Sequence, residues 1–154
     1  MPIKFVFWIV IGLAILGFAY YAISPLFRNI TVNETLPSET PDATSTPPAE
    51  PPEVERFPIA DTPLHPAEGF ARIVDADGTI YVRYEDYKTI NGPDLFVYLS
   101  KDLDAKEFVS LGELKATEGN INYEVPEDVN VEDYKYVLTW CKAFGVLFNS
   151  ARLR

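Results

Sequence analysis

The feature that most restricts the fold of this chain is an apolar run near its amino terminus. Residues 5–27 contain no ionisable side chain other than tyrosine, and Lys4 and Arg28 flank them. As a helix, a run of this length covers the hydrocarbon core of a bilayer, which is about 30 Å thick. We therefore predict that residues 1–28 form an N-terminal transmembrane signal-anchor, which contacts the lipid bilayer through residues 5–27.

A cleaved signal peptide is the alternative interpretation, because the run opens the chain and follows a lysine. Ala22 and Ser24 supply the small residues of a cleavage site, but the run is long for a signal peptide. The amino terminus and Lys4 together carry more positive charge than Arg28 on the other side, which favours an N-in orientation. We expect a single-pass protein of the cell membrane, with its C-terminal domain outside the cytoplasm.

Residues 29–68 have a very different composition. They are rich in proline, acidic residues, serine and threonine, and they hold few large apolar side chains. Such a segment cannot bury enough apolar surface to offset the entropy lost when it becomes ordered. We predict a disordered, extended tether between the anchor and the domain. Asn29 and Asn33 begin two N-glycosylation sequons, which are used only if the source organism has the machinery.

From residue 69 the pattern changes to short runs of β-branched and aromatic residues between turn residues. Asp77 and Gly78 separate two such runs, which is a strong signal for a β-hairpin. The runs that we expect to form strands are residues 69–74, 79–84, 95–99, 108–111, 121–125, 134–141 and 146–153. Residues 131–133 could form a turn of helix. The pattern predicts an all-β fold for residues 69–154, a single small antiparallel β-sandwich or barrel of about seven strands.

Charge and residue counts exclude several classes of function. The chain has 13 basic and 23 acidic side chains and a net charge of −10, so it repels nucleic acid. Its single histidine, His65, lies outside the predicted domain, so we predict no zinc site, no blue-copper site and no Ser-His-Asp triad. Its single cysteine, Cys141, cannot form an intrachain disulfide, although a lone thiol could link two copies into a dimer outside the cell.

Three motifs in the C-terminal part are similar to those of a known family. They are NGPDLFVYLS at 91–100, LGELKATEGNINYEVP at 111–126 and YKYVLTWCKAFGVLFNSARL at 134–153. Through these motifs residues 69–153 resemble the electron-transfer DM-thirteen domain family, the module found beside DOMON domains in Skeletor-like proteins. The sequence departs from that pattern at Tyr87, where phenylalanine is usual, and at Asn149, where glycine is common.

The resemblance implies an extracytoplasmic β domain with a signature cysteine, here Cys141. In the family this cysteine is proposed to act in redox chemistry, as a free thiol or as a ligand of a prosthetic group such as haem. Read from the residues alone, Cys141 shares one face of its strand with Val137 and Thr139, and Trp140 lies on the other. The sulfur is accessible if the Trp140 face is the main core face, and it is an inert core thiol if both faces are covered.

The predicted function is therefore a membrane-anchored extracytoplasmic electron-transfer or thiol-redox module that uses Cys141, with a redox or surface protein as its partner. The sequence requires no cofactor. Any haem would bind non-covalently, since no CxxCH motif is present, and Trp140 and Phe144 would lie around it. The alternative is a non-catalytic recognition or adhesion module at the cell surface, in which Cys141 is structural. Both hypotheses favour a redox carrier or binding module over an enzyme with a substrate pocket.

Overall fold

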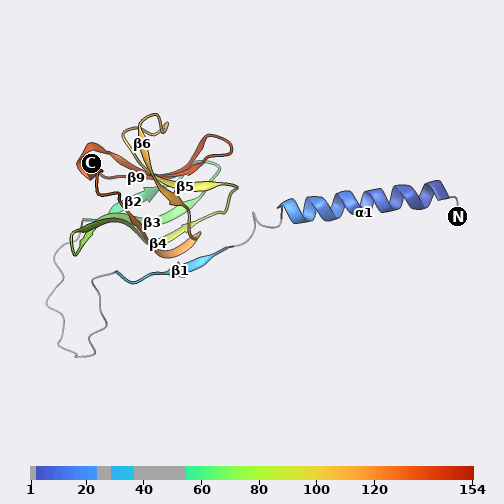
Figure 1. Ribbon diagram of the computed structural model, residues 1–154, viewed down its shortest axis with the longest axis horizontal. Helices are drawn as coiled ribbons and strands as arrows, with labels where there is room; N and C mark the ends of the chain where they lie inside the picture. Colours follow the sequence, from blue (N-terminus) through green and yellow to red (C-terminus); the bar gives the residue numbers. More distant parts are fainter. Residues whose placement is uncertain (1–2, 24–28, 37–54) are drawn as a thin grey trace, which may run out of the picture.

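The structure is a computed structural model that describes residues 3–23, 29–36 and 55–154. Helix α1 covers Ile3–Ile23 and lies apart from the strands, which together form one β domain (Figure 1). Among the described residues, no helix meets the length and hydropathy needed to cross a membrane. The transmembrane anchor over residues 5–27 stays a prediction.

The β domain is a single nine-stranded sheet. Its strands are β1 (Thr31–Asn33), β2 (Phe57–Ala60), β3 (Ala67–Ala76), β4 (Thr79–Thr89), β5 (Leu95–Ser100), β6 (Phe108–Glu113), β7 (Glu118–Glu124), β8 (Tyr136–Cys141) and β9 (Val146–Arg152). Their order across the sheet is β1-β7-β4-β3-β2-β9-β8-β5-β6. A short 3-10 helix, η2 (Val131–Asp133), precedes β8. The β1–β7 pair is parallel, and the other pairs are antiparallel.

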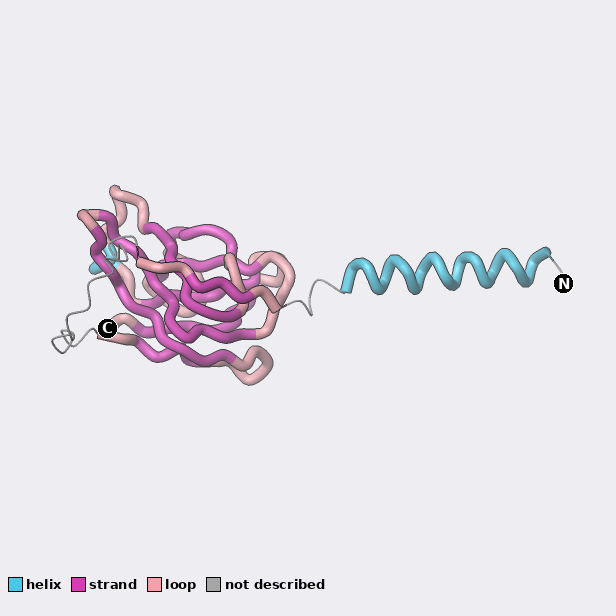
Figure 2. Tube along the Cα trace, turned by 90° about the horizontal axis from the view of Figure 1, so that it is seen from below, coloured by secondary structure: helices cyan, strands magenta, loops and turns pink. Residues whose placement is uncertain are grey.

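Strand β2 is the point at which the sheet curls over on itself. Phe57 and Pro58 pair with β3, whereas Ile59 and Ala60 pair with β9. The two halves of the sheet therefore curve around a shared interior, which Figure 2 shows along a second direction. Fully buried side chains from both halves fill that interior; they include Tyr84, Tyr123, Leu99 and Val137. The result is a curled sheet in the form of a half-barrel.

The structure confirms the all-β prediction for the C-terminal part. All seven predicted strands are present as β3–β9, and residues 131–133 form the predicted turn of helix. Asp77 and Gly78 form the turn between β3 and β4 with φ of 53° and 85°. Positive φ at both positions is what a tight hairpin turn of this kind requires. The predicted number of strands is too low, and the sheet is not wholly antiparallel, because β1 and β2 were not expected.

Both unexpected strands lie in residues 29–68, where we predicted a disordered tether. That prediction is wrong at both ends of the range, and its middle, residues 37–54, lies outside the described residues. The domain therefore begins well before residue 69. Residues 37–54 connect two strands of one domain, and only residues 24–28 lie between α1 and the first described residue of that domain, Asn29.

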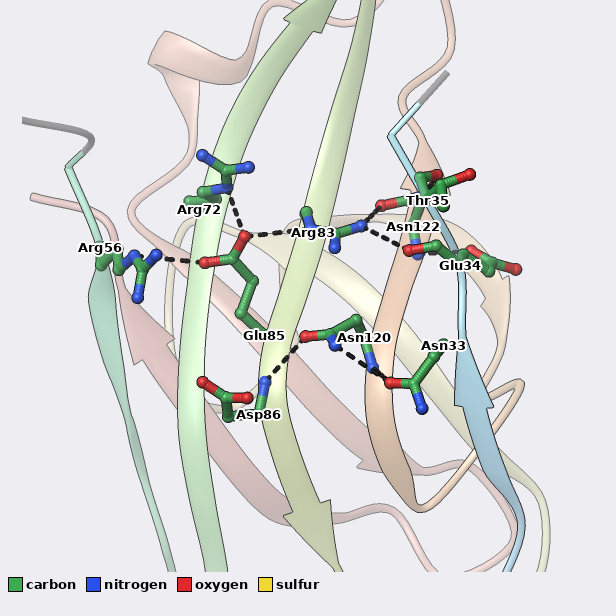
Figure 3. Close-up of polar contacts among 10 residues, drawn as sticks. All are labelled: Asn33, Glu34, Thr35, Arg56, Arg72, Arg83, Glu85, Asp86, Asn120 and Asn122. Atoms are coloured by element: carbon green, nitrogen blue, oxygen red, sulfur yellow. Dashed lines mark hydrogen bonds and ion pairs between the residues drawn. The ribbon is translucent and has the colours of Figure 1, made fainter. Parts of the chain in front are cut away.

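Polar contacts hold the β1 segment on the sheet (Figure 3). Arg83 Nη1 donates hydrogen bonds to the Glu34 carbonyl oxygen at 3.1 Å and to Asn122 Oδ1 at 2.7 Å. The Asn122 backbone N–H donates to Glu34 Oε2 at 2.7 Å, and Asn120 donates from its backbone and side chain to Asn33 Oδ1. These bonds join the edge strand β1 to β7 and β4, so residues 29–36 belong to the domain despite their polar composition.

Arg83 also joins this segment to a buried ionic cluster on β3 and β4 (Figure 3). Glu85 is 8% exposed as a residue, and its carboxylate lies 3.0 Å from Arg83 Nε, 2.9 Å from Arg72 Nε and 3.2 Å from Arg56 Nε. A buried carboxylate is stable only when paired, and here three guanidinium groups surround it. The cluster ties the residues just before β2 to the centre of the sheet.

Candidate functional site

Cys141 is the last residue of β8, and its side chain is fully buried, with 0% exposed. Its Sγ donates a hydrogen bond to the Pro93 carbonyl oxygen at 3.0 Å. The residue packs with Leu95 and Phe148 in a small apolar cluster beside the main core. A thiol with its proton directed at a carbonyl and with apolar neighbours behaves as a small core side chain.

Both faces of β8 are covered near the cysteine. Val137 and Thr139 share the face of Cys141 and are fully buried, and Leu138 on the other face is also fully buried. Trp140, on that other face, is only partly buried. The structure therefore corresponds to the alternative in which the thiol is packed inside, and not to the alternative in which it reaches solvent.

A cavity of about 1050 Å³ opens next to this buried thiol. It is lined by Asn29, by residues 64–68 and 88–93, and by Phe144, Val146 and Phe148. Most of these side chains are apolar, and Phe144, in the turn between β8 and β9, is 71% exposed. Cys141 and Trp140 are not among the lining residues. Of the three predicted site residues, only Phe144 borders the cavity, so the structure does not bring the three around one ligand.

Phe148 and Pro93 contact both the cavity and Cys141. The Phe148 ring has room because residue 92 is glycine, since a Cβ there would lie 2.5 Å from Phe148 Cζ. The thiol is thus one side chain away from the cavity. A molecule in the cavity could touch the sulfur only if Phe148 or Pro93 moved.

His65 also lies in the cavity wall, inside the domain and not in a tether as the composition suggested. Its imidazole stacks on the Phe148 ring, with the ring centroids 3.8 Å apart. Thr62 Oγ1 donates a hydrogen bond to the Phe148 carbonyl oxygen at 3.0 Å and lies 2.8 Å from His65 Nδ1. Sequence reasoning missed this residue; its only sequence signal is the spacing of Thr62 and His65 in a short turn.

The Thr62 hydroxyl determines the tautomer of the neutral imidazole. A hydroxyl has one proton, and the Thr62 proton is directed at the Phe148 carbonyl. With the Thr62 proton on that carbonyl, the contact with Nδ1 is a hydrogen bond from Nδ1–H to Thr62 Oγ1, and we take this arrangement for the neutral ring. His65 Nε2 then carries a lone pair, and the described residues supply no hydrogen-bond partner for it. The cavity wall thus presents this acceptor beside apolar groups, together with five other polar or charged side chains, those of Asn29, Glu68, Lys88, Thr89 and Asn91.

A buried network of hydroxyl and amide groups lies behind the same wall. Asn149 Nδ2 donates to Tyr87 Oη at 3.0 Å and to Thr89 Oγ1 at 3.2 Å, and Thr89 borders the cavity. Tyr87 stacks on Tyr84, with the centroids 4.4 Å apart. Burial raises the pKa of Tyr87 to about 12 and raises the pKa of Tyr84 well above its usual value. Both phenols are neutral at physiological pH.

The two departures from the family pattern, Tyr87 and Asn149, are therefore hydrogen-bonded to each other. A phenol hydroxyl buried here without a partner would be costly, and two groups supply partners, the amide of Asn149 at 3.0 Å and the hydroxyl of Thr139 at 2.9 Å. The departures act as a matched pair inside the core. Neither one touches Cys141 in the contacts described above.

Comparison with known proteins gives one match. Residues 59–153, more than half of the chain, match the family model described as electron transfer DM13. No curated protein and no solved structure matches the chain. The matched region begins within β2, which agrees with the early start of the domain, and it contains both His65 and Cys141. The chain belongs to the electron transfer DM13 family.

Proposed function

We propose that this chain is a membrane-anchored electron-transfer module, whose β domain lies outside the cytoplasm and meets its redox partner at the cavity beside Cys141. One observation carries the proposal: the match to the electron transfer family covers both the buried thiol and nearly all of the cavity wall. In this proposal Cys141 is the redox group. It becomes reactive only when Phe148 or Pro93 moves, because its sulfur is closed off in the structure.

A haem ligated by Cys141 does not fit the residues. Its Sγ is hydrogen-bonded to Pro93 and does not border the cavity, and Trp140 lies on the opposite face of the strand. Phe144 alone remains as a neighbour of such a group. We therefore derive no step of electron transfer through a haem bound to this cysteine.

The membrane anchor is part of the proposal because of the apolar run at residues 5–27. The chain between α1 and the domain is short, and this limits how far an anchored domain could lie from the bilayer. Six residue steps separate Ile23 at the end of α1 from Asn29 in the cavity wall, and they span at most roughly 20 Å. An anchored domain would therefore sit close to the bilayer, with its cavity on the near side.

A recognition or adhesion module is the second candidate, and the burial of Cys141 favours it. In that case the thiol only fills space in the core. A disulfide-linked dimer through Cys141 needs the same movement as the redox reaction, because a fully buried sulfur cannot reach a second copy of the chain.

Electron exchange by the full chain in lipid nanodiscs tests the proposal. We expect each Cys141 thiol to give one electron to ferricyanide, which becomes ferrocyanide, and to release its proton to water; Cys141→Ala should lose that reaction. Leu103→Ala, at an exposed position after β5, is the matched control and should behave like the wild type. If the wild type leaves the oxidant unchanged and a maleimide labels Cys141 only in denaturant, the recognition module is the better account.

A further inference from the structure

We infer that the cavity is a binding site for an apolar aromatic ligand that carries a hydroxyl group, of the phenol and hydroquinone class. In this site His65 Nε2 accepts the hydrogen bond from the ligand hydroxyl. The inference goes beyond the proposed electron transfer, which does not use His65. It also holds if the domain is a recognition module.

The orientation and tautomer of His65 are set before any ligand arrives. The imidazole is stacked on Phe148, and its Nδ1–H is directed at Thr62, whose own proton is directed at the Phe148 carbonyl. The backbones of Thr62 and His65 are also hydrogen-bonded to each other, at 3.3 Å and 3.0 Å. A ring held in this way loses little freedom on binding, so its Nε2 is a preorganised acceptor.

The surroundings of Nε2 favour a ligand that is mostly hydrocarbon. Leu64, Ile90, Phe144 and Val146 border the cavity, and each exposes more than a third of its surface. The charged lining residues, Glu68 and Lys88, form an ion pair at 3.8 Å and are themselves largely exposed. An apolar pocket with few polar groups is the usual form of a small-molecule site, and its volume of about 1050 Å³ is ample for a ring system.

The acceptor at Nε2 selects among apolar ligands. A hydroxyl donates a proton to the lone pair, whereas a carboxylate or a ketone would place its own lone pairs against it. A metal ion held by the protein needs several ligands, and the described residues contain no group of three or more His, Cys, Asp and Glu side chains that could supply them. A hydroxyl on an aromatic ring satisfies both the acceptor and the apolar wall.

Imidazole nitrogen NMR of the full chain in lipid nanodiscs tests the inference. The chain has one histidine, so the spectrum needs no assignment. Without ligand, we expect the Nδ1–H tautomer. Adding 2-naphthol should shift the Nε2 resonance in the direction of an accepted hydrogen bond. Adding 2-methoxynaphthalene, which has the same rings but no hydroxyl, should not. An Nε2–H tautomer, or equal shifts with both compounds, would overturn the inference.

Equilibrium dialysis against protein-free nanodiscs gives the affinity. We expect His65→Phe, which keeps an aromatic ring, to weaken 2-naphthol binding by roughly threefold to tenfold, the usual worth of one hydrogen bond. The affinity for 2-methoxynaphthalene should be unchanged. An equal loss of affinity for both compounds would contradict the role of Nε2 as the hydrogen-bond acceptor.

A second variant tests the place of binding without touching His65. Val146→Trp puts a large ring into the cavity and should abolish binding of both compounds. Leu103→Trp puts the same ring at an exposed loop position and should bind them like the wild type. Thermal unfolding of both variants shows that each is folded. Undiminished binding to a folded Val146→Trp variant would place the ligand elsewhere and refute the site.

Discussion

Phe148 has two neighbours of very different character, the only cysteine and the only histidine of the chain. Cys141 is fully buried, and its one proton is directed at the Pro93 carbonyl. His65 borders an open cavity, with one nitrogen bound to Thr62 and the other without a partner among the described residues. Cys141, which has the more reactive side chain, is closed off from solvent. His65, which the composition placed in a tether, borders the cavity.

The difference shows that the chemistry open to a side chain depends on its exposure and on the hydrogen bonds that its reactive atom already makes. A thiol needs to become a thiolate in contact with its reactant, and Cys141 has neither the exposure nor a neighbouring cation that borders its sulfur in the contacts described. A neutral imidazole needs one free nitrogen with a fixed direction, and the Thr62 hydroxyl provides that. Phe148 keeps the two environments apart, so changes at this ring test the comparison most strongly.

Replacing Phe148 with alanine should have the largest effect. The ring is 5% exposed, and its loss leaves a hole between the cavity and the thiol, so we expect the free energy of unfolding to fall by about 3–5 kcal/mol. Cys141 should then react with a maleimide under native conditions. Urea unfolding and labelling rates of the full chain measure the two effects.

Phe144→Ala is the matched control for that variant, because it removes an equal ring that is 71% exposed. We expect nearly wild-type stability and an unchanged labelling rate. If Cys141 reacts no faster in a folded Phe148→Ala variant than in this control, another group closes off the sulfur.

Alkaline pH should be the next largest perturbation, because it ionises phenols that are neutral in the sealed core. Burial raises the pKa of Tyr87 to about 12, so the folded state keeps a proton that the unfolded state loses above about pH 10. Stability is complete below pH 10 and should fall by about 2 kcal/mol by pH 12 from this residue alone. Urea unfolding between pH 10 and pH 12 measures how steeply the free energy of unfolding falls with pH.

Tyr136→Phe serves as the control for the alkaline experiment, because it removes a partly exposed phenol of β8 and leaves the buried ones in place. We expect its slope to match that of the wild type. A slope that is flat in the wild type would mean that the buried phenols ionise as readily as in the unfolded chain.

Cys141→Ala should have a smaller effect on stability. It removes the sulfur from an apolar cluster and leaves the Pro93 carbonyl without its donor, which should cost about 1–2 kcal/mol. Because the sulfur does not border the cavity, the affinity for 2-naphthol should be unchanged. Cys141→Ser, which keeps a donor, shows how much of the cost belongs to the hydrogen bond. A clear loss of 2-naphthol affinity in the folded alanine variant would place the thiol at the ligand.

Local sequence patterns were sufficient to predict β3–β9. Alternating side chains mark these strands, and Asp77 and Gly78 mark a turn whose backbone few other residues adopt. Strands β1 and β2 are too short for a pattern of their own. β1 is held by partners such as Asn120, which is 87 positions away from Asn33 in the sequence. Composition cannot show such distant hydrogen bonds, and so the segment resembled a tether.

The site was predictable only in part for the same reason. Cys141 stands out because it is a lone cysteine in a family motif, but its burial depends on Pro93, in the turn before β5, and on Phe148 of β9. His65 lies in a proline-rich segment, so composition places it outside the domain. Its importance depends on the Phe148 carbonyl, 86 positions from Thr62 in the sequence. No pattern in a single sequence shows that the Thr62 hydroxyl links His65 to the Phe148 carbonyl.

Thr62→Val is the smallest change, because it replaces one hydroxyl group with a methyl group. Valine has nearly the shape of threonine, but it cannot accept the proton of Nδ1 or donate to the Phe148 carbonyl. We expect a loss of about 1 kcal/mol in the free energy of unfolding. Imidazole nitrogen NMR should show a mixture of tautomers in place of one, and 2-naphthol should bind more weakly by about twofold to threefold. Thr62→Ser keeps the hydroxyl and should retain the single tautomer. If the valine variant keeps it too, Thr62 does not determine the state of His65, and the stacking on Phe148 alone must hold the ring.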